Sequence, residues 1–116
     1  YIYEVHPTIL KAGFFKKVQE LGVWQLGQHT HLYSSNERVH DFPGKVYEKI
    51  SSGPVQREWL IPHLGDLRAN ISTKNFPMKA EALRQKLKLK DGGEFTLFGI
   101  QNKHEKNELI LCKKCP

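Results

Sequence analysis

Two cysteines and two histidines are the side chains in this sequence with the spacing of a metal site. Cys112 and Cys115 form a C-x-x-C pair, and His29 and His31 form an H-x-H pair. Zinc binds four such ligands in a tetrahedron, so together they could make a Cys2His2 site. A redox C-x-x-C pair opens a helix after a strand, whereas here Pro116 follows directly. Because no second C-x-x-C pair is present, we favour free thiols without metal at the end of a strand.

The sequence carries none of the short motifs that mark common catalytic centres. There is no G-x-G-x-x-G or Walker loop, no G-x-S-x-G elbow and no H-E-x-x-H. Gly92-Gly93 follows Asp91 and has the composition of a turn. His29 and His31 have no nucleophile placed beside them by a motif. We therefore predict no catalytic residues in this chain.

The positive charge is concentrated in one short segment. Residues 66–90 hold seven Lys or Arg and two Asp or Glu, which gives this segment +5 of the total net charge of +6. Such a segment favours a polyanionic partner such as nucleic acid. The alternative is a solvated helix face that serves solubility, because lysine-rich helices are common.

Length and composition indicate one globular domain. The chain has 116 residues, of which 39% are hydrophobic and 26% charged. No apolar run approaches the roughly 18 residues of a membrane helix, so we expect no membrane partner. Two cysteines are too few for a disulfide framework, which favours the reducing cytoplasm. Since the first residue is Tyr1 and not Met, we expect a fragment of a longer protein.

Hydrophobic periodicity and turn residues predict the elements that must position these side chains. After an extended start at residues 1–5, two short helices over 7–12 and 14–21 are expected to end at Gly22. The remaining predicted elements, in chain order, are strands 32–34 and 45–50, helix 55–64, strand 68–75, helix 79–88, and strands 95–100 and 108–113.

From residue 45 the order is β-α-β-α-β-β, which predicts an α/β fold in the broad sense, α+β. One layer of helices over one mixed or antiparallel sheet would bury all the apolar faces as a two-layer sandwich. Residues 1–44 are expected to be an N-terminal helical segment with a strand that packs toward an upstream domain, and residues 45–116 the α/β core.

The basic segment yields the candidate binding residues. Along the strand at 68–75, the apolar side chains of Ala69 and Ile71 alternate with polar side chains that face the other way. On the following helix, three lysines fall within about 40° of one another at 100° per residue. Contacts from these groups would go to phosphates. The seven candidates are Arg68, Asn70, Ser72, Lys74, Lys79, Lys86 and Lys90.

Several stretches together resemble a known family. They are Tyr3-Glu4 with Ile9–Gly13, His29–Ser35, Asp41–Val46, Ala69–Pro77 and Leu83–Gly93. Over nearly the whole chain they are similar to the C-terminal THUMP-like domain of bacterial class I S-adenosylmethionine-dependent methyltransferases, particularly the Bacteroidetes type. One departure lies at Met78-Lys79, where the family has a small polar residue that caps the helix.

This resemblance implies a catalytic domain upstream of Tyr1 that binds S-adenosylmethionine. It also implies that the present domain helps to bind or position RNA, because THUMP domains are associated with RNA-modifying enzymes. A different class of function is a protein-interaction domain that packs on the catalytic domain and never contacts RNA. The segregated charge favours RNA, and the apolar side chains near the N-terminus favour interdomain packing in either case.

Overall fold

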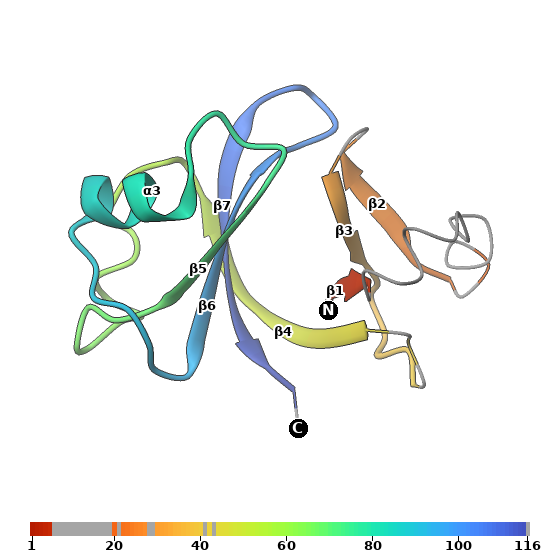
Figure 1. The fold of residues 1–116 in the computed structure, drawn as a ribbon. Helices are drawn as coiled ribbons and strands as arrows, with labels where there is room; N and C mark the ends of the chain where they lie inside the picture. Colours follow the sequence, from red (N-terminus) through yellow and green to blue (C-terminus); the bar gives the residue numbers. More distant parts are fainter. Residues whose placement is uncertain (6–19, 21, 28–29, 41, 43, 116) are drawn as a thin grey trace.

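The computed structural model describes residues 1–5, 20, 22–27, 30–40, 42 and 44–115 (Figure 1). Seven strands and one helix are present in these residues. Their bounds are β1 Ile2–Val5, β2 Trp24–Gly27, β3 Thr30–Ser34, β4 Gly44–Gly53, β5 Asn70–Lys74, α3 Ala80–Leu87, β6 Phe95–Gln101 and β7 Asn107–Lys114.

All seven strands belong to one sheet in the order β2-β3-β1-β4-β7-β6-β5. Neighbouring strands are antiparallel except β5 and β6, which run parallel and are joined through α3. A parallel pair needs such a crossover because a short turn cannot bring the chain back to the starting end. The predicted α+β class with a mixed sheet is therefore confirmed.

The sheet folds back on itself along β4. The first residues of β4, from Gly44 to Tyr47, pair with β1, and the stretch from Tyr47 to Gly53 pairs with β7. The register shifts between Lys49 and Ser51, which is a β-bulge, and a bulged strand bends and twists more strongly. Figure 1 shows β4 sweeping from β1–β3 across to β5–β7.

One face of β5–β7 is closed by α3 and by the turns that follow β4. Leu83 and Leu87 of α3 pack on Leu97 of β6 and on Leu109 and Leu111 of β7, all of them buried. Residues three or four apart share one face of a helix, so this spacing gives α3 its apolar stripe. Leu60, Leu64 and Ala69 complete this α3-side core.

The opposite face of β6 and β7 packs against β1, β3 and β4. This groove-side core holds Ile2, Leu32, Tyr47, Phe98, Ile100, Ile110 and Cys112. The two arms of the folded sheet touch at one end, where the Thr30 hydroxyl donates a hydrogen bond of 2.7 Å to the Gln101 carbonyl oxygen. A Cβ at Gly27 would lie 2.3 Å from that same oxygen, so only glycine permits this approach.

The predicted helix at 55–64 is wrong. This stretch forms successive turns, in which the Leu60 N–H donates to the Arg57 carbonyl and the His63 N–H to the Leu60 carbonyl. Pro62 has no N–H to donate and disfavours helical backbone at Ile61, so a regular helix cannot continue through it. The apolar spacing still serves the fold, because Leu60 and Leu64 are buried beneath α3.

Other expectations fare differently. The helix at 79–88 and the strands at 95–100 and 108–113 are confirmed as α3, β6 and β7, whereas β2 was not predicted. The helices expected at 7–12 and 14–21 fall outside the described residues except for residue 20, and Gly22 has the positive φ of 84° suited to a helix stop.

Lys79 is the N-cap of α3 and its side chain makes no capping bond. In the described part of the chain, no helix has the length and apolar character that a membrane crossing requires.

Candidate functional site

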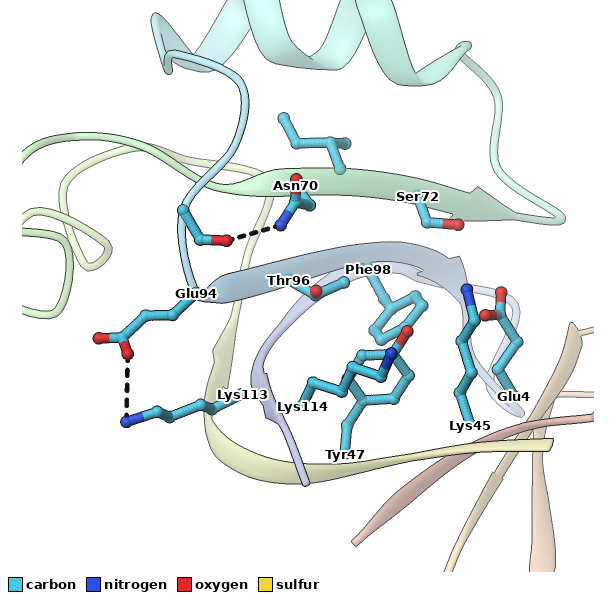
Figure 2. A pocket seen from close by; sticks show the side chains of 12 residues that line it. Glu4, Lys45, Tyr47, Asn70, Ser72, Glu94, Thr96, Phe98, Lys113 and Lys114 are labelled. Atoms are coloured by element: carbon cyan, nitrogen blue, oxygen red, sulfur yellow. Dashed lines mark hydrogen bonds and ion pairs between the residues drawn. The ribbon is translucent and has the colours of Figure 1, made fainter. Parts of the chain in front are cut away.

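A groove opens between the two arms of the folded sheet, on the face of β5–β7 opposite α3 (Figure 2). Its volume is about 680 Å³. Five strands and the turn before β6 contribute to its walls. The lining residues are Glu4, Lys45, Tyr47, Asn70, Ile71, Ser72, Gly93, Glu94, Thr96, Phe98, Lys113 and Lys114.

Among the described residues, two polar contacts join the arms at one end of the groove, and the other end is open. The Thr30–Gln101 hydrogen bond and an ion pair of 2.7 Å between Lys74 Nζ and Glu4 Oε2 join the arms where β5 and β6 end. Asn70 and Thr96, which are paired across β5 and β6, lie at the opposite ends of these strands and line the open part.

Two lysines bring positive charge into the groove without an ion-pair partner among the described residues. Lys45 enters from β4 and Lys114 from β7, and both are exposed. A third cation, Lys113, lies 3.4 Å from Glu94, so its charge is largely compensated. Since Glu4 is paired with Lys74, the charges of the groove that have no ion-pair partner among the described residues are positive. We call these the open charges.

Tyr47 and Phe98 form the floor of the groove. Their rings meet edge to face with centroids 5.1 Å apart, and Tyr47 lies beside its cross-strand partner Lys114 (Figure 2). Burial, and then the nearby Glu4 carboxylate, raise the pKa of Tyr47 to about 12. The phenol is therefore neutral near pH 7, and its O–H can donate to an anionic oxygen. Phe98 is fully buried and offers no surface for stacking.

Uncharged polar groups complete the wall made by β5 and β6. Asn70 donates to the carbonyl oxygens of Gly93 at 3.0 Å and of Phe95 at 3.3 Å, which fixes its amide at the mouth of the groove. Ser72 and Thr96 add hydroxyl groups on the same face. The predicted alternation along this strand is confirmed, since Ala69 and Ile71 pack into the α3-side core.

The two cations predicted on the strand at 68–75 are engaged within the protein. Arg68 Nη1 donates to the Asp91 carbonyl oxygen at 2.7 Å, and its Nε lies 3.6 Å from an Asp66 carboxylate oxygen. Lys74 is bound to Glu4 as described above. Of the four candidates in this stretch, the groove therefore receives Asn70 and Ser72.

The three lysines predicted on one helix edge do not share a helix. Lys79 is the N-cap of α3, and Lys86 lies within the helix. Lys90 lies beyond the end of the helix and forms an isolated parallel β-bridge with Arg68 through the backbone. The helix stops because Lys88 adopts a left-handed conformation with φ of 54°. Because α3 covers the face opposite the groove, Lys86 cannot act together with Asn70 and Ser72 at one site.

The zinc alternative receives no support from the described residues. His29 lies outside them, His31 is half-buried on β3, and no group of three or more His, Cys, Asp or Glu in the described ranges could hold a metal ion. Cys112 is buried in the groove-side core, where burial raises the pKa of its thiol to about 12. A thiol with such a pKa opposes the thiolate that zinc requires.

The groove is suited to binding phosphate and sugar groups. It combines open ammonium groups with neutral hydroxyl and amide donors, which is the set that contacts phosphate and sugar groups. Sequence reasoning missed Lys45, Tyr47, Thr96 and Lys114 because they come from three strands that meet only through the fold of the sheet. The available signal was weak: Lys45 and Lys114 flank the apolar parts of their strands.

Comparisons with known proteins agree with this architecture. A family model described as THUMP domain-like matches residues 45–114, and one described as a ferredoxin-like domain matches residues 1–43. A crystal structure described as a "putative methyltransferase" from Porphyromonas gingivalis W83, a member of the Bacteroidetes, is 37% identical with a TM-score of 0.86. The match covers 99% of this chain but only 29% of that one. Among curated proteins, none matches.

Proposed function

Since the chain belongs to the THUMP domain-like family over residues 45–114, we propose that it is a non-catalytic accessory domain of an S-adenosylmethionine-dependent methyltransferase that binds RNA in the groove. The observation that carries the proposal is the pair of open ammonium groups, Lys45 and Lys114, above a floor with a neutral Tyr47 hydroxyl. Cations beside neutral donors hold an RNA backbone by its phosphates and 2′-hydroxyl groups.

We place the S-adenosylmethionine site and the catalytic residues outside this chain. A cofactor loop of the glycine-rich kind leads from a strand into a helix. Here Gly92 and Gly93 lead from α3 into β6, which is the reverse order. The Porphyromonas gingivalis chain is more than three times as long as the matched region, which leaves room for a catalytic domain in a protein of that kind. The cytoplasm, where RNA is modified, is the proposed compartment.

RNA bound in this way would be recognised by backbone and shape. The aromatic rings of the groove are buried, since Tyr47 is 6% exposed and Phe98 is fully covered. Bases therefore have no ring on which to stack, in contrast to proteins that read single strands through aromatic platforms. We expect weak binding with little sequence preference.

The test is fluorescence anisotropy of a labelled RNA across a salt series. Each phosphate contact contributes about −0.7 to the slope of log affinity against log salt for a single strand. The double variant Lys45→Gln, Lys114→Gln should flatten the slope by about 1.4 and weaken all sequences similarly. The matched control is Lys103→Gln, Lys106→Gln, which removes two exposed cations from the turn between β6 and β7 and should leave the slope unchanged.

Two results would overturn the groove as the RNA site. Either the wild-type chain binds no RNA at low salt, or both double variants lose affinity equally. The first result would favour a second candidate, an interaction domain that packs on the catalytic domain. Its specific support is Trp24 on the edge strand β2, which is 47% exposed although tryptophan is highly buried on average.

A further inference from the structure

A second cavity lies on the other side of the sheet, where the turns after β4 meet the end of α3. Its volume is about 390 Å³. Arg57 comes from the turns, while Lys86 and Lys88 come from the last turn of α3 and its C-cap. Val55 and Leu87 give it an apolar base that adjoins the α3-side core. Three cations from two separate segments therefore face one hollow.

Arg57 is the unusual member of this cluster. Its Nε is shielded from solvent and has no hydrogen-bond acceptor among the described residues. Two other arginines nearby are satisfied: Arg84 binds Glu81 and the Leu89 carbonyl, and Arg68 binds the Asp91 carbonyl. Native proteins leave few buried donors without a partner, and a bound ion is one of the ways in which such a donor is satisfied. The guanidinium of Arg57 is thus held ready for an anion.

The two lysines add charge that nothing in the described chain neutralises. Lys86 and Lys88 are exposed and form no ion pair with any described residue. Glu58 is the one carboxylate in the lining, and within the described ranges it pairs with none of the three cations. The cavity therefore carries three positive charges and one negative charge.

We propose that Arg57, Lys86 and Lys88 form a binding site for a dianionic terminal phosphate group, separate from the groove. A guanidinium offers two parallel N–H donors to phosphate oxygens, and flanking ammonium groups act as point charges. The excess of two positive charges matches a terminal phosphate, which carries about −1.5 to −2 near pH 7. A phosphodiester or a carboxylate carries a single charge and matches less well.

The phosphate has two possible sources, a free phosphate and the phosphorylated end of an RNA. The RNA source rests on the proposed function, whereas binding of free phosphate does not. The first experiment is therefore a titration of the chain with inorganic phosphate, followed by backbone amide NMR at constant ionic strength. Saturable shifts are expected at residues 55–58 and 86–88, and not at the groove residues Lys45 and Tyr47.

Variants then assign the site. Arg57→Gln should weaken phosphate binding by about tenfold or more, because it removes the bidentate donor. Arg68→Gln is the matched control, since it makes the same change at an arginine outside the cavity, and it should bind phosphate as the wild type does. If Arg57→Gln does not fold, the exposed pair Lys86→Gln, Lys88→Gln takes its place with the same expected loss.

The second experiment compares one RNA carrying a 5′-phosphate with the same RNA carrying a 5′-hydroxyl. Tighter binding of the phosphorylated RNA by the wild type, lost in Arg57→Gln, assigns the site to an RNA end. Equal binding of the two RNAs, with saturable inorganic phosphate, assigns it to a free phosphate. The proposal is overturned if phosphate shifts do not saturate, if Arg68→Gln loses as much as Arg57→Gln, or if acetate binds as tightly as phosphate. A phosphate site that persists when no RNA binds would remove the proposed function and leave this inference standing.

Discussion

The two faces of strands β5–β7 arise from the same alternation of side chains, but one face is a closed core and the other is lined by an open groove. On the α3 side, leucines from β6, β7 and α3 close a core without titratable side chains. On the groove side, the second arm of the sheet covers Ile100 and Ile110 but leaves the neighbourhood of Asn70 and Thr96 open. The groove thus forms where the second arm of the sheet separates from β5–β7.

The difference follows from what covers each face. Figure 1 shows α3 on one side of β5–β7, while β1–β3 lie on the other side, where the curved β4 leads to them. In the part of the chain that the structure describes, the contacts of Thr30 with Gln101 and of Glu4 with Lys74 join the arms where β5 and β6 end. An arm that separates from β5–β7 cannot fill the whole face, so polar side chains occupy the wedge that remains.

The largest expected effect comes from the closed face. Leu83→Ala truncates a fully buried side chain that packs over Gly99 of β6. Its loss should lower the free energy of unfolding by about 2–5 kcal/mol, the usual range for such cavities. Ser72→Ala on the groove face should change it by less than about 0.5 kcal/mol. Urea unfolding measures both, and equal losses would contradict the distinction between a core face and a site face.

The sequence predicts the second half of this fold better than the first. α3, β6 and β7 have clear periods and are separated by strong turns such as Asp91-Gly92-Gly93, in which both glycines take positive φ. The turns at 55–64 carry helical spacing, but Pro62 prevents the helix. β2 has four residues and ends in a glycine, so no periodic signal marks it.

The site was predicted only in part, for a physical reason. Alternation along β5 correctly placed Asn70 and Ser72 on one face, because successive side chains of a strand point to opposite faces and this pattern is visible in a few consecutive residues. Glu4 engages Lys74, and the Asp91 carbonyl oxygen engages Arg68, from positions far away in the sequence. A local charge pattern could have pointed to Asp66 as a partner of Arg68, but not to these two contacts. Counting the charge of one segment also could not find Lys45 and Lys114.

Alkaline pH should destabilise the protein through the groove-side core. Burial raises the pKa of the Cys112 thiol from 9.0, and burial with the Glu4 carboxylate raises the pKa of the Tyr47 phenol from 10.0, each to about 12. Between about pH 9 and 12 the unfolded state therefore releases protons that the folded state keeps. Stability is unaffected below pH 9 and falls above it, by about 1.4 kcal/mol per pH unit for each group ionised in the unfolded state.

Urea midpoints measured from pH 7 to pH 11 test this expectation. Cys112→Ala should remove the part of the decline that begins near pH 9 and leave the part that begins near pH 10. Cys115→Ala, the same change at a half-buried cysteine, is the control and should retain the wild-type decline. A flat profile in the wild type would show that the groove-side core does not hold these two groups neutral.

The smallest expected effect concerns the ion pair at the closed end of the groove. The side chains of Lys74 and Glu4 are 30% and 22% exposed, so water screens their attraction. A double-mutant cycle with Lys74→Gln and Glu4→Gln should give a coupling free energy below about 1 kcal/mol in urea unfolding. A coupling of several kcal/mol would instead make this pair part of what holds the two arms together.

RNA binding should separate the two single variants even though their stabilities are similar. Glu4→Gln releases the Lys74 ammonium toward the groove and should steepen the salt slope by about 0.7, the contribution of one further phosphate contact. Lys74→Gln leaves the Glu4 carboxylate beside its cross-strand neighbour Lys45, where it neutralises one of the two open cations and should flatten the slope by about the same amount. The two variants should change the slope in opposite directions, because one removes the negative member and the other the positive member of a neutral ion pair. Slopes that stay unchanged in both variants would mean that the RNA does not reach this end of the groove, and slopes that move in the same direction would contradict the prediction.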